Sequence, residues 1–316
     1  MTFNNFLSIR KICGNGYPKE PADVIGTVAF TCHNVDVPMM PVLLSVPHAG
    51  RDYPAELLAN LRVAAADLIR LEDRYADRLV QPAIAAGYPA IVAQRARAWI
   101  DLNRAETDID IGMFSEKGGV ERPATPSAKA RGGLGLFPRR LQACGELWRG
   151  PMTYDDANHR IEHYHRPYHR AVSEALHAMR ARFGVAVLID VHSMPPLPPH
   201  INSGSVAGGS PSLVVGDRFG RSAVSIYAEL AMARGKAAGM ETALNSPYAG
   251  DHVLQTHGDP RNGIHAVQLE IDRSHYLDSQ LREPTAKLKA IASLVLAIAS
   301  DFADQSIGRS FAEAAE

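Results

Sequence analysis

The sequence predicts an α/β fold, a three-layer αβα sandwich in which helices cover both faces of a central, mostly parallel (mixed) sheet. Short apolar runs bounded by turn residues alternate along the chain with longer stretches of helical periodicity. The composition agrees with a folded chain, because 46% hydrophobic and 21% charged residues over 316 positions are close to the globular average. Neither a G-x-G-x-x-G run after the first strand nor a G-x-x-x-x-G-K-[ST] run occurs, so the two common nucleotide-binding forms of this fold class lose their main support.

The predicted strands are short apolar runs that stop at turn residues. The first covers 41–46 and ends in the turn Pro47–Gly50. The clearest covers 185–191, where every residue except Asp190 is apolar. The other predicted strands are 90–93, 99–102, 212–215 and 266–271.

The predicted helices follow from apolar residues at three- and four-residue steps. This spacing covers 65–86 and 154–183. Two further helices are predicted, one over 221–235 and a final apolar one over 281–303. Within the helix at 154–183 Pro167 is expected to introduce a kink, and Gly184 is expected to end the helix.

Candidate functional residues occur from His48 to Glu270 and must meet in one site. This favours a single catalytic α/β domain over residues 39–305. Residues 1–38 are predicted to be an N-terminal tail or peripheral segment, and 306–316 a C-terminal tail. The segment 105–150 is rich in glycine and proline and predicts a long irregular loop. Such a loop is either a functional lining of the site or a surface insertion.

Charge and cysteine content limit the partners and the location. Lys and Arg total 33 and Asp and Glu total 34, so the formal charge of −1 gives no reason to expect nucleic acid or an anionic membrane as a partner. The three cysteines Cys13, Cys32 and Cys144 are widely spaced and are predicted to be ordinary thiols in a reducing compartment. Because no signal peptide or membrane-spanning run is evident, we expect a cytoplasmic protein.

Chemically active side chains follow several predicted strands. His48 follows the first, Asn103 and Arg104 follow the run at 99–102, His192 follows the clearest strand, and Glu270 lies in the last. In open α/β sheets ligands bind beyond the carboxyl ends of the strands, so these side chains are expected at one edge. Two histidines and one carboxylate form a catalytic zinc set, and a further carboxylate is then needed as general base.

The run His159–His163 is a competing local motif. It matches H-x-x-E-H, a pattern of zinc proteases in which both histidines share one helix face. His165 and His169 repeat the same spacing in a strongly polar stretch, and Pro167 lies within one turn. A solvated, histidine-rich helix face is therefore the favoured interpretation, and an inverzincin-type protease is a distant alternative.

Taken together, the motifs make the chain resemble the N-formylglutamate amidohydrolase family. They occur in the order typical of that family and span about residues 40–280. The matching segments are Ser45–Gly50, Asp73–Leu79, Ile100–Arg104, Gly133–Gly135 with Pro138 and Arg139, Pro167–His169, Asp190–Ser193, and Gln268–Glu270 with Tyr276.

The resemblance implies a phosphorylase/hydrolase-like fold related to the zinc carboxypeptidases, and one bound zinc ion. His48, Asp73 and His192 would hold the ion, with Glu72 as the alternative acidic ligand. Catalysis would fall to Glu270, which activates water, together with Arg104. The carboxylate of a small N-acyl amino acid would lie on Asn103 and Arg104, with Arg131 as a weaker second candidate.

The implied reaction is hydrolysis of an N-formyl amino acid, foremost N-formyl-L-glutamate to L-glutamate and formate, as in histidine degradation. The run Leu71–Tyr75 differs from the one expected of the histidine-degradation enzyme, so the amino acid stays open. One alternative is a zinc amidohydrolase or carboxypeptidase-like enzyme acting on another N-acyl amino acid or peptide. A second is a binding protein without catalysis. The oligomeric state does not follow from the sequence.

Overall fold

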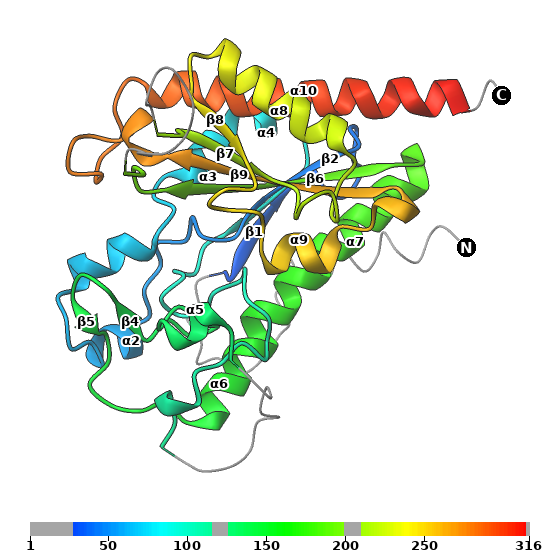
Figure 1. Cartoon of the computed structure of the whole chain (residues 1–316). Helices are drawn as coiled ribbons and strands as arrows, with labels where there is room; N and C mark the ends of the chain where they lie inside the picture. The colour runs from blue at the N-terminus through cyan, green and yellow to red at the C-terminus, as the bar shows by residue number, and fades with distance from the viewer. Residues whose placement is uncertain (1–27, 116–125, 199–209, 314–316) are drawn as a thin grey trace.

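In the computed structural model, which describes residues 28–115, 126–198 and 210–313, one mixed sheet forms the centre of the protein (Figure 1). Its strand order is β1-β3-β2-β6-β9-β7-β8. The central strands β3, β2, β6 and β9 are parallel, whereas β1 and β7 are antiparallel to their inner neighbours. The strands are β1 (Phe30–His33), β2 (Val42–Val46), β3 (Ala90–Ala93), β6 (Ala186–Met194), β7 (Leu213–Gly216), β8 (Thr242–Leu244) and β9 (Ile264–Asp272).

Helices cover both faces of this sheet, which confirms the predicted three-layer architecture. Figure 1 shows α8 and α10 on one face and α7 and α9 on the other. Two hydrophobic clusters, one on each side of the sheet, form the core. The α-helices are α2 (Ala55–Ala59), α3 (Ala76–Leu79), α4 (Gln81–Ala85), α5 (Ala128–Arg131), α6 (Tyr154–Arg160), α7 (Arg166–Phe183), α8 (Ser225–Ala237), α9 (His252–His257) and α10 (Leu288–Glu313).

The described structure also contains short 3-10 turns and one small hairpin. The turns cover Ala65–Leu71, Ile111–Met113, Pro260–Asn262 and Arg273–His275, and the hairpin pairs β4 (Arg140–Leu141) with β5 (Gly145–Glu146).

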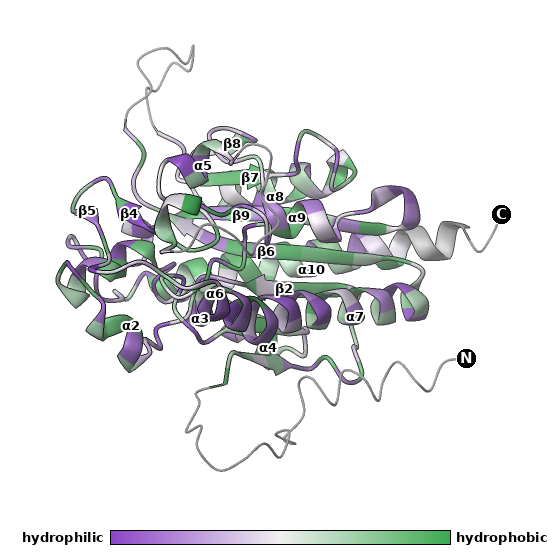
Figure 2. Ribbon diagram, turned by 90° about the horizontal axis from the view of Figure 1, so that it is seen from below, coloured by the Kyte–Doolittle hydropathy of each residue, from purple (hydrophilic) through white to green (hydrophobic). Residues whose placement is uncertain are grey.

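The predicted buried strands are largely confirmed, because their side chains lack solvent contact on both faces. All nine residues of β6 are buried, as are all five of β2. Figure 2 shows mostly hydrophobic residues along β2 and β6. The hydrophilic members of β6 include Asp190 and His192. The prediction of a strand at 99–102 is wrong. Those residues form a buried turn in which Trp99 N–H donates to Ala96 and Asp101 N–H donates to the carbonyl oxygen of Leu136.

The segment 65–86 is not one helix. A 3-10 turn ends at Leu71, Glu72 is extended, and Tyr75 has φ of 61°, so the helical path resumes only at Ala76. The break is held by the N–H of Asp73, which donates to the carbonyl oxygen of His48 at 2.9 Å. At this break Tyr75 adopts a left-handed conformation, which is uncommon for residues other than glycine. The interruption is what places Asp73 beside the turn that follows β2.

The second predicted helix runs as expected from Tyr154 to Phe183, with one departure. A π-helical turn, Ile161–His165, joins α6 to α7, and Pro167 lies in the first turn of α7. Pro167 has no amide hydrogen to donate to the preceding turn. The wider π-helical turn accommodates this missing hydrogen bond, so the helix continues without a break. Gly184 ends the helix with φ of 80°, as predicted.

Two described elements reach beyond residues 39–305. Strand β1 lies within the segment predicted as peripheral and pairs with β3, and α10 continues past residue 305. Cys32 in β1 is disulfide-bonded, which corrects the prediction of an ordinary thiol, whereas Cys144 is free. Among the described helices, α10 contains a stretch, Leu288–Gly308, long and apolar enough to cross a membrane. Because 50% of that stretch is buried inside the protein, a core helix explains it equally well.

Gly50 allows the turn after β2 to pass close to the end of β3. A Cβ atom at this position would lie 2.1 Å from the carbonyl oxygen of Arg95, a backbone atom. We expect Gly50→Ala to lower the free energy of unfolding by about 1–3 kcal/mol, since overpacking forces a backbone shift. Urea denaturation measures this. The control is Gly150→Ala, whose Cβ would meet its nearest atom at 3.6 Å. Equal stability of both variants would contradict the proposed close approach.

Candidate active site

The carboxyl edge of the central strands gathers the predicted chemistry. His48 follows β2, while Asp190 and His192 lie in β6 and Glu270 lies in β9. His192 and Glu270 are direct neighbours in the parallel register of the two strands. Side chains two residues apart share one face of a strand, so Asp190 lies on the same side as His192.

His48, Asp73 and His192 form one buried group. One ligand atom of each lies within 4.8 Å of the others, and all three side chains are buried. Oδ2 of Asp73 is 2.9 Å from Nδ1 of His192 and 3.5 Å from Nδ1 of His48. The structure therefore brings together the three residues predicted as metal ligands.

Two further carboxylates orient the histidine rings. Nε2 of His48 lies 2.7 Å from Oδ1 of Asp101, and Nε2 of His192 lies 2.8 Å from Oδ2 of Asp190. Both Nδ1 atoms consequently face Asp73. An imidazole held by a carboxylate on one nitrogen and presenting the other is the usual arrangement around a protein-bound metal ion. The donor set thus fits a divalent ion of zinc type.

The buried charges in this group shift each other's pKa values. Burial acts to raise the pKa of Asp73, but hydrogen bonds from His192 and His48 outweigh it and hold the pKa well below its usual range. Burial acts to lower the pKa of His192, yet the charges of Asp190 and Asp73 raise it well above its usual value. Burial raises the pKa of Glu270 to about 7, which suits a group that exchanges protons near neutral pH.

Glu72, the alternative acidic ligand, faces different partners. It accepts hydrogen bonds from the hydroxyl of Tyr53 and from Arg74. It belongs to neither of the potential metal-binding groups found among the described residues. The geometry therefore favours Asp73.

The predicted carboxylate-binding residues lie at different places. Nδ2 of Asn103 is 3.3 Å from Nε2 of His192, so Asn103 lies directly beside the metal-ligand group. Arg104 is buried and donates to Asp251 at 2.9 Å and to the carbonyl oxygen of Leu134 at 3.1 Å. Arg131 is exposed at the end of α5, and its guanidinium donates to the carbonyl oxygen of Pro126.

Sequence reasoning missed three charged residues around the site. Asp101 lies inside the motif Ile100–Arg104 and could have been found from its place two residues before Asn103. Arg97 pairs with Asp101 at 2.8 Å. Arg273 donates to Oδ1 of Asp73 at 2.9 Å and to Ser193, and its position three residues after Glu270 was the available signal.

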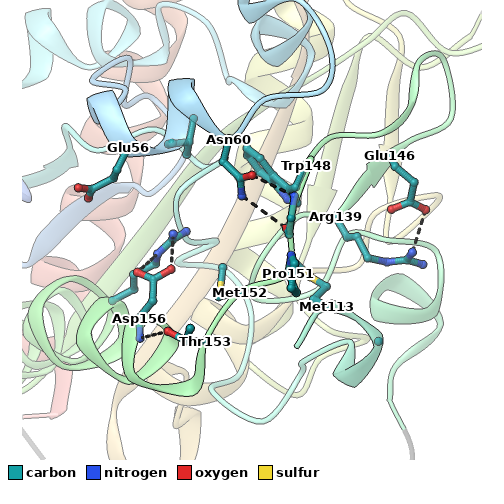
Figure 3. A pocket seen from close by; sticks show the side chains of 14 residues that line it. Glu56, Asn60, Met113, Arg139, Glu146, Trp148, Pro151, Met152, Thr153 and Asp156 are labelled. Atoms are coloured by element: carbon teal, nitrogen blue, oxygen red, sulfur yellow. Dashed lines mark hydrogen bonds and ion pairs between the residues drawn. The ribbon is translucent and has the colours of Figure 1, made fainter. Parts of the chain in front are cut away.

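The segment 105–150 contacts the site through its backbone, since the carbonyl oxygens of Leu134 and Leu136 accept from Arg104 and Asp101. Next to it lies a cavity of about 500 Å³ between α2, α6 and the 139–153 segment. Figure 3 shows Arg139 paired with Glu146 in this cavity. Asp156, which also lines the cavity, pairs with Arg160. None of the candidate site residues is among the residues that line it.

The competing motif at 159–163 does not form a site. His159 and His163 are exposed and stack on each other with ring centroids 4.2 Å apart. Within the described part of the chain they join no group of three potential ligands.

A buried histidine–carboxylate group with a neighbouring glutamate at the carboxyl edge of an α/β sheet is an arrangement that hydrolytic enzymes use. Residues 40–277 match the family model described as N-formylglutamate amidohydrolase. The chain therefore belongs to the N-formylglutamate amidohydrolase family, which places it among the hydrolases of linear amide C–N bonds and confirms the resemblance of its motifs.

Individual relatives agree with this membership. The chain is 30% identical over 245 residues to N-formylglutamate deformylase of Pseudomonas aeruginosa, a match that covers 76% of this chain and 84% of the relative. The deformylase of Pseudomonas putida is 30% identical over 242 residues, covering 76% and 82%. The crystal structure of N-formylglutamate amidohydrolase from Ralstonia eutropha has a TM-score of 0.79 at 26% identity, covering 89% of this chain and 99% of that one.

Proposed function

We propose that this protein hydrolyses the amide bond of an N-formyl amino acid, with N-formyl-L-glutamate as substrate and L-glutamate and formate as products. The observation that carries the proposal is the buried group of His48, Asp73 and His192 with Glu270 beside it on the neighbouring strand. The names of the relatives supply the substrate. A role in histidine degradation is part of the proposal.

The proposal includes one zinc ion held by His48, Asp73 and His192. A bound zinc ion supplies a Lewis acid that polarises a carbonyl group and lowers the pKa of water to about 7. Asp101 and Asp190 keep the two histidine rings in the tautomer that presents Nδ1. Arg273 holds the other oxygen of Asp73, so that Oδ2 stays directed at the histidines.

Glu270 acts as general base and then as general acid. Its carboxylate takes a proton from the attacking water and delivers it to the amine nitrogen that leaves. Gln268 donates to Oε1 of Glu270 at 3.0 Å and fixes the carboxyl group while this happens. Asn103 and Arg104 bind the substrate carboxylate and orient the amide towards Glu270.

The decisive experiment is a substrate panel on zinc-loaded enzyme. Formate release from N-formyl-L-glutamate is compared with amine release from N-acetyl-L-glutamate and from other N-formyl amino acids. Formate from N-formyl-L-glutamate as the fastest product supports the proposal. Hydrolysis of another N-acyl amino acid alone would assign the chain to a different amidohydrolase, and substrate binding without any product would make it a binding protein.

Arg104 is expected to contribute mainly to substrate affinity. Arg104→Lys removes the planar, two-pronged donor, and the loss of one charge-assisted hydrogen bond of about 1.5 kcal/mol raises KM roughly tenfold. Initial rates at varied substrate concentration measure this. Arg131→Lys is the matched control and leaves KM unchanged, because Arg131 lies exposed on the carbonyl of Pro126. A larger KM effect in Arg131→Lys would move the carboxylate site to α5.

We keep a cytoplasmic location as a proposal. The disulfide at Cys32 counts against it, since disulfides are rare in reducing compartments. Fractionation of cells that express the protein tests the location directly.

A further inference from the structure

A second histidine cluster lies outside the candidate active site. His165 ends the π-helical turn, His169 lies one turn further in α7, and His252 and His257 come from α9. The ring of His169 is centred 4.3 Å from that of His165, 5.0 Å from that of His252 and 5.2 Å from that of His257. Two parts of the chain that are far apart in sequence, 165–169 and 252–257, therefore bring four imidazoles close together.

Backbone carbonyls fix which ring nitrogens carry hydrogen in two of these residues. Nε2 of His165 lies 2.7 Å from the carbonyl oxygen of Arg104, and Nε2 of His169 lies 2.9 Å from that of Leu102. A carbonyl oxygen can only accept, so each Nε2 donates and each neutral ring keeps its lone pair on Nδ1. An imidazole that donates one N–H to a backbone carbonyl and presents its other nitrogen is typical of metal ligands.

Three of the four rings place a ligand atom close enough to share one ion. One ligand atom each of His165, His169 and His252 lies within 4.8 Å of the others. Nδ1 of His165 is buried and has no hydrogen-bond partner among the described residues, and Oε1 of Glu106 lies 3.6 Å from it. Nε2 of His257 and Nδ1 of His169 are hydrogen-bonded at 2.9 Å, a distance close to the roughly 3 Å between nitrogens that share one zinc ion.

The environment favours the neutral form of three of these rings, and a neutral imidazole is the form that binds metal. Burial and the neighbouring histidines lower the pKa of His169 well below its usual value. Burial, followed by the charge of His165, lowers the pKa of His252 to about 4. Burial likewise lowers the pKa of His257 to about 3. Near neutral pH the lowered pKa values leave His169, His252 and His257 as uncharged nitrogen donors.

We propose that His165, His169 and His252 bind a second divalent transition-metal ion, separate from the group His48, Asp73 and His192. All-imidazole sets suit zinc, copper, nickel and iron rather than magnesium or calcium. His257 can complete the set from its place beside Nδ1 of His169.

The location gives this ion a structural role. Leu102 and Arg104 offer their carbonyl oxygens to the two histidines, while Asn103 between them contacts His192. The N–H of Val253 in α9 also donates to Oδ1 of Asn103 at 2.8 Å. An ion that joins α7 to α9 would therefore fix the loop that carries the substrate-binding pair.

Zinc titration of protein stripped with a chelator tests the proposal, with bound equivalents counted by elemental analysis. Wild type is expected to bind two equivalents, and His252→Ala one. The double variant His48→Ala/His192→Ala is expected to keep one equivalent, which disappears when His252→Ala is added. His252 is half-buried, so its truncation should leave the fold intact, as circular dichroism checks. His159→Ala, which removes half of a stacked histidine pair on the same helix, is the matched control and should bind two equivalents.

The proposal is overturned if His252→Ala binds as much zinc as wild type, or if the double variant binds none. These outcomes are distinct from failure of the proposed active-site metal. In that case the double variant would bind as much zinc as wild type while His252→Ala still lost one equivalent. Absorption of the cobalt-substituted protein gives a second readout, because loss of one of two ligand sets changes the spectrum without reference to activity.

Discussion

Glu270→Gln is expected to lower kcat by about 10²–10⁴-fold while leaving metal content and thermal stability unchanged, because it removes only the proton-accepting oxygen of a positioned general base. The side chain keeps its size, and the amide of Gln268 can still donate to the remaining carbonyl oxygen at position 270. Steady-state formate release measures the effect, and elemental analysis measures the metal.

The matched control for Glu270→Gln is Glu146→Gln. Glu146 is also a carboxylate paired within the protein, since Arg139 donates to it at 2.8 Å, but it lines the separate cavity of Figure 3. We expect its kcat to stay within about twofold of wild type, as for substitutions away from the chemistry. A Glu270→Gln variant that keeps more than a tenth of wild-type kcat would remove Glu270 from the proton-transfer role.

The strand ends could be predicted from sequence because burial leaves a simple pattern. The apolar run before His48 and the one that contains Asp190 and leads to His192 predict central strands. Parallel strands place their carboxyl ends at one edge. His48, His192 and Glu270 were located by this argument alone. The choice of Asp73 over Glu72 needed the family resemblance, since neighbouring residues in a helical pattern offer no local way to tell which one faces the site.

The errors arise where tertiary hydrogen bonds override local pattern. The run Trp99–Leu102 has strand-like composition, but its backbone bonds to Leu136, which lies in the irregular segment and carries no pairing signal. The helical spacing of 65–86 likewise hides the break at Tyr75, which exists because Asp73 N–H is drawn to His48. Both departures occur next to the candidate site. Functional sites are where the backbone most often departs from the secondary structure that the local sequence favours.

His165 and His169 show that a local sequence pattern can also fail to predict burial. Their polar neighbourhood in the sequence favoured a solvated helix face, yet His165 is only 2% exposed. One residue that packs against it, His252, lies 87 positions later in the chain, with ring centroids 5.6 Å apart. A local pattern cannot report burial supplied by a distant helix, so the cluster emerges only from the three-dimensional structure.

Asp73→Asn is expected to bind one equivalent of zinc less than wild type and to lose more than about 10²-fold in kcat. The substitution keeps the shape of the side chain but removes the charged oxygen that faces Nδ1 of both His48 and His192. A carboxylate binds zinc in its deprotonated, negatively charged form. The neutral amide of asparagine is a far weaker zinc ligand. Elemental analysis of dialysed protein measures the loss.

Glu72→Gln is the adjacent control that separates the two candidate acidic ligands. Glu72 is also buried, and its oxygens are already engaged by Tyr53 and Arg74 rather than by a histidine. Its variant should therefore keep the full zinc content and most of the activity, although loss of a buried ionic partner lowers its thermal stability. Because Asp73→Asn also weakens the pair with Arg273, circular dichroism must show that both variants are folded at the assay temperature. Loss of zinc from Glu72→Gln but not from Asp73→Asn would reverse the assignment, and with it the explanation of why the chain breaks its helical path at Tyr75.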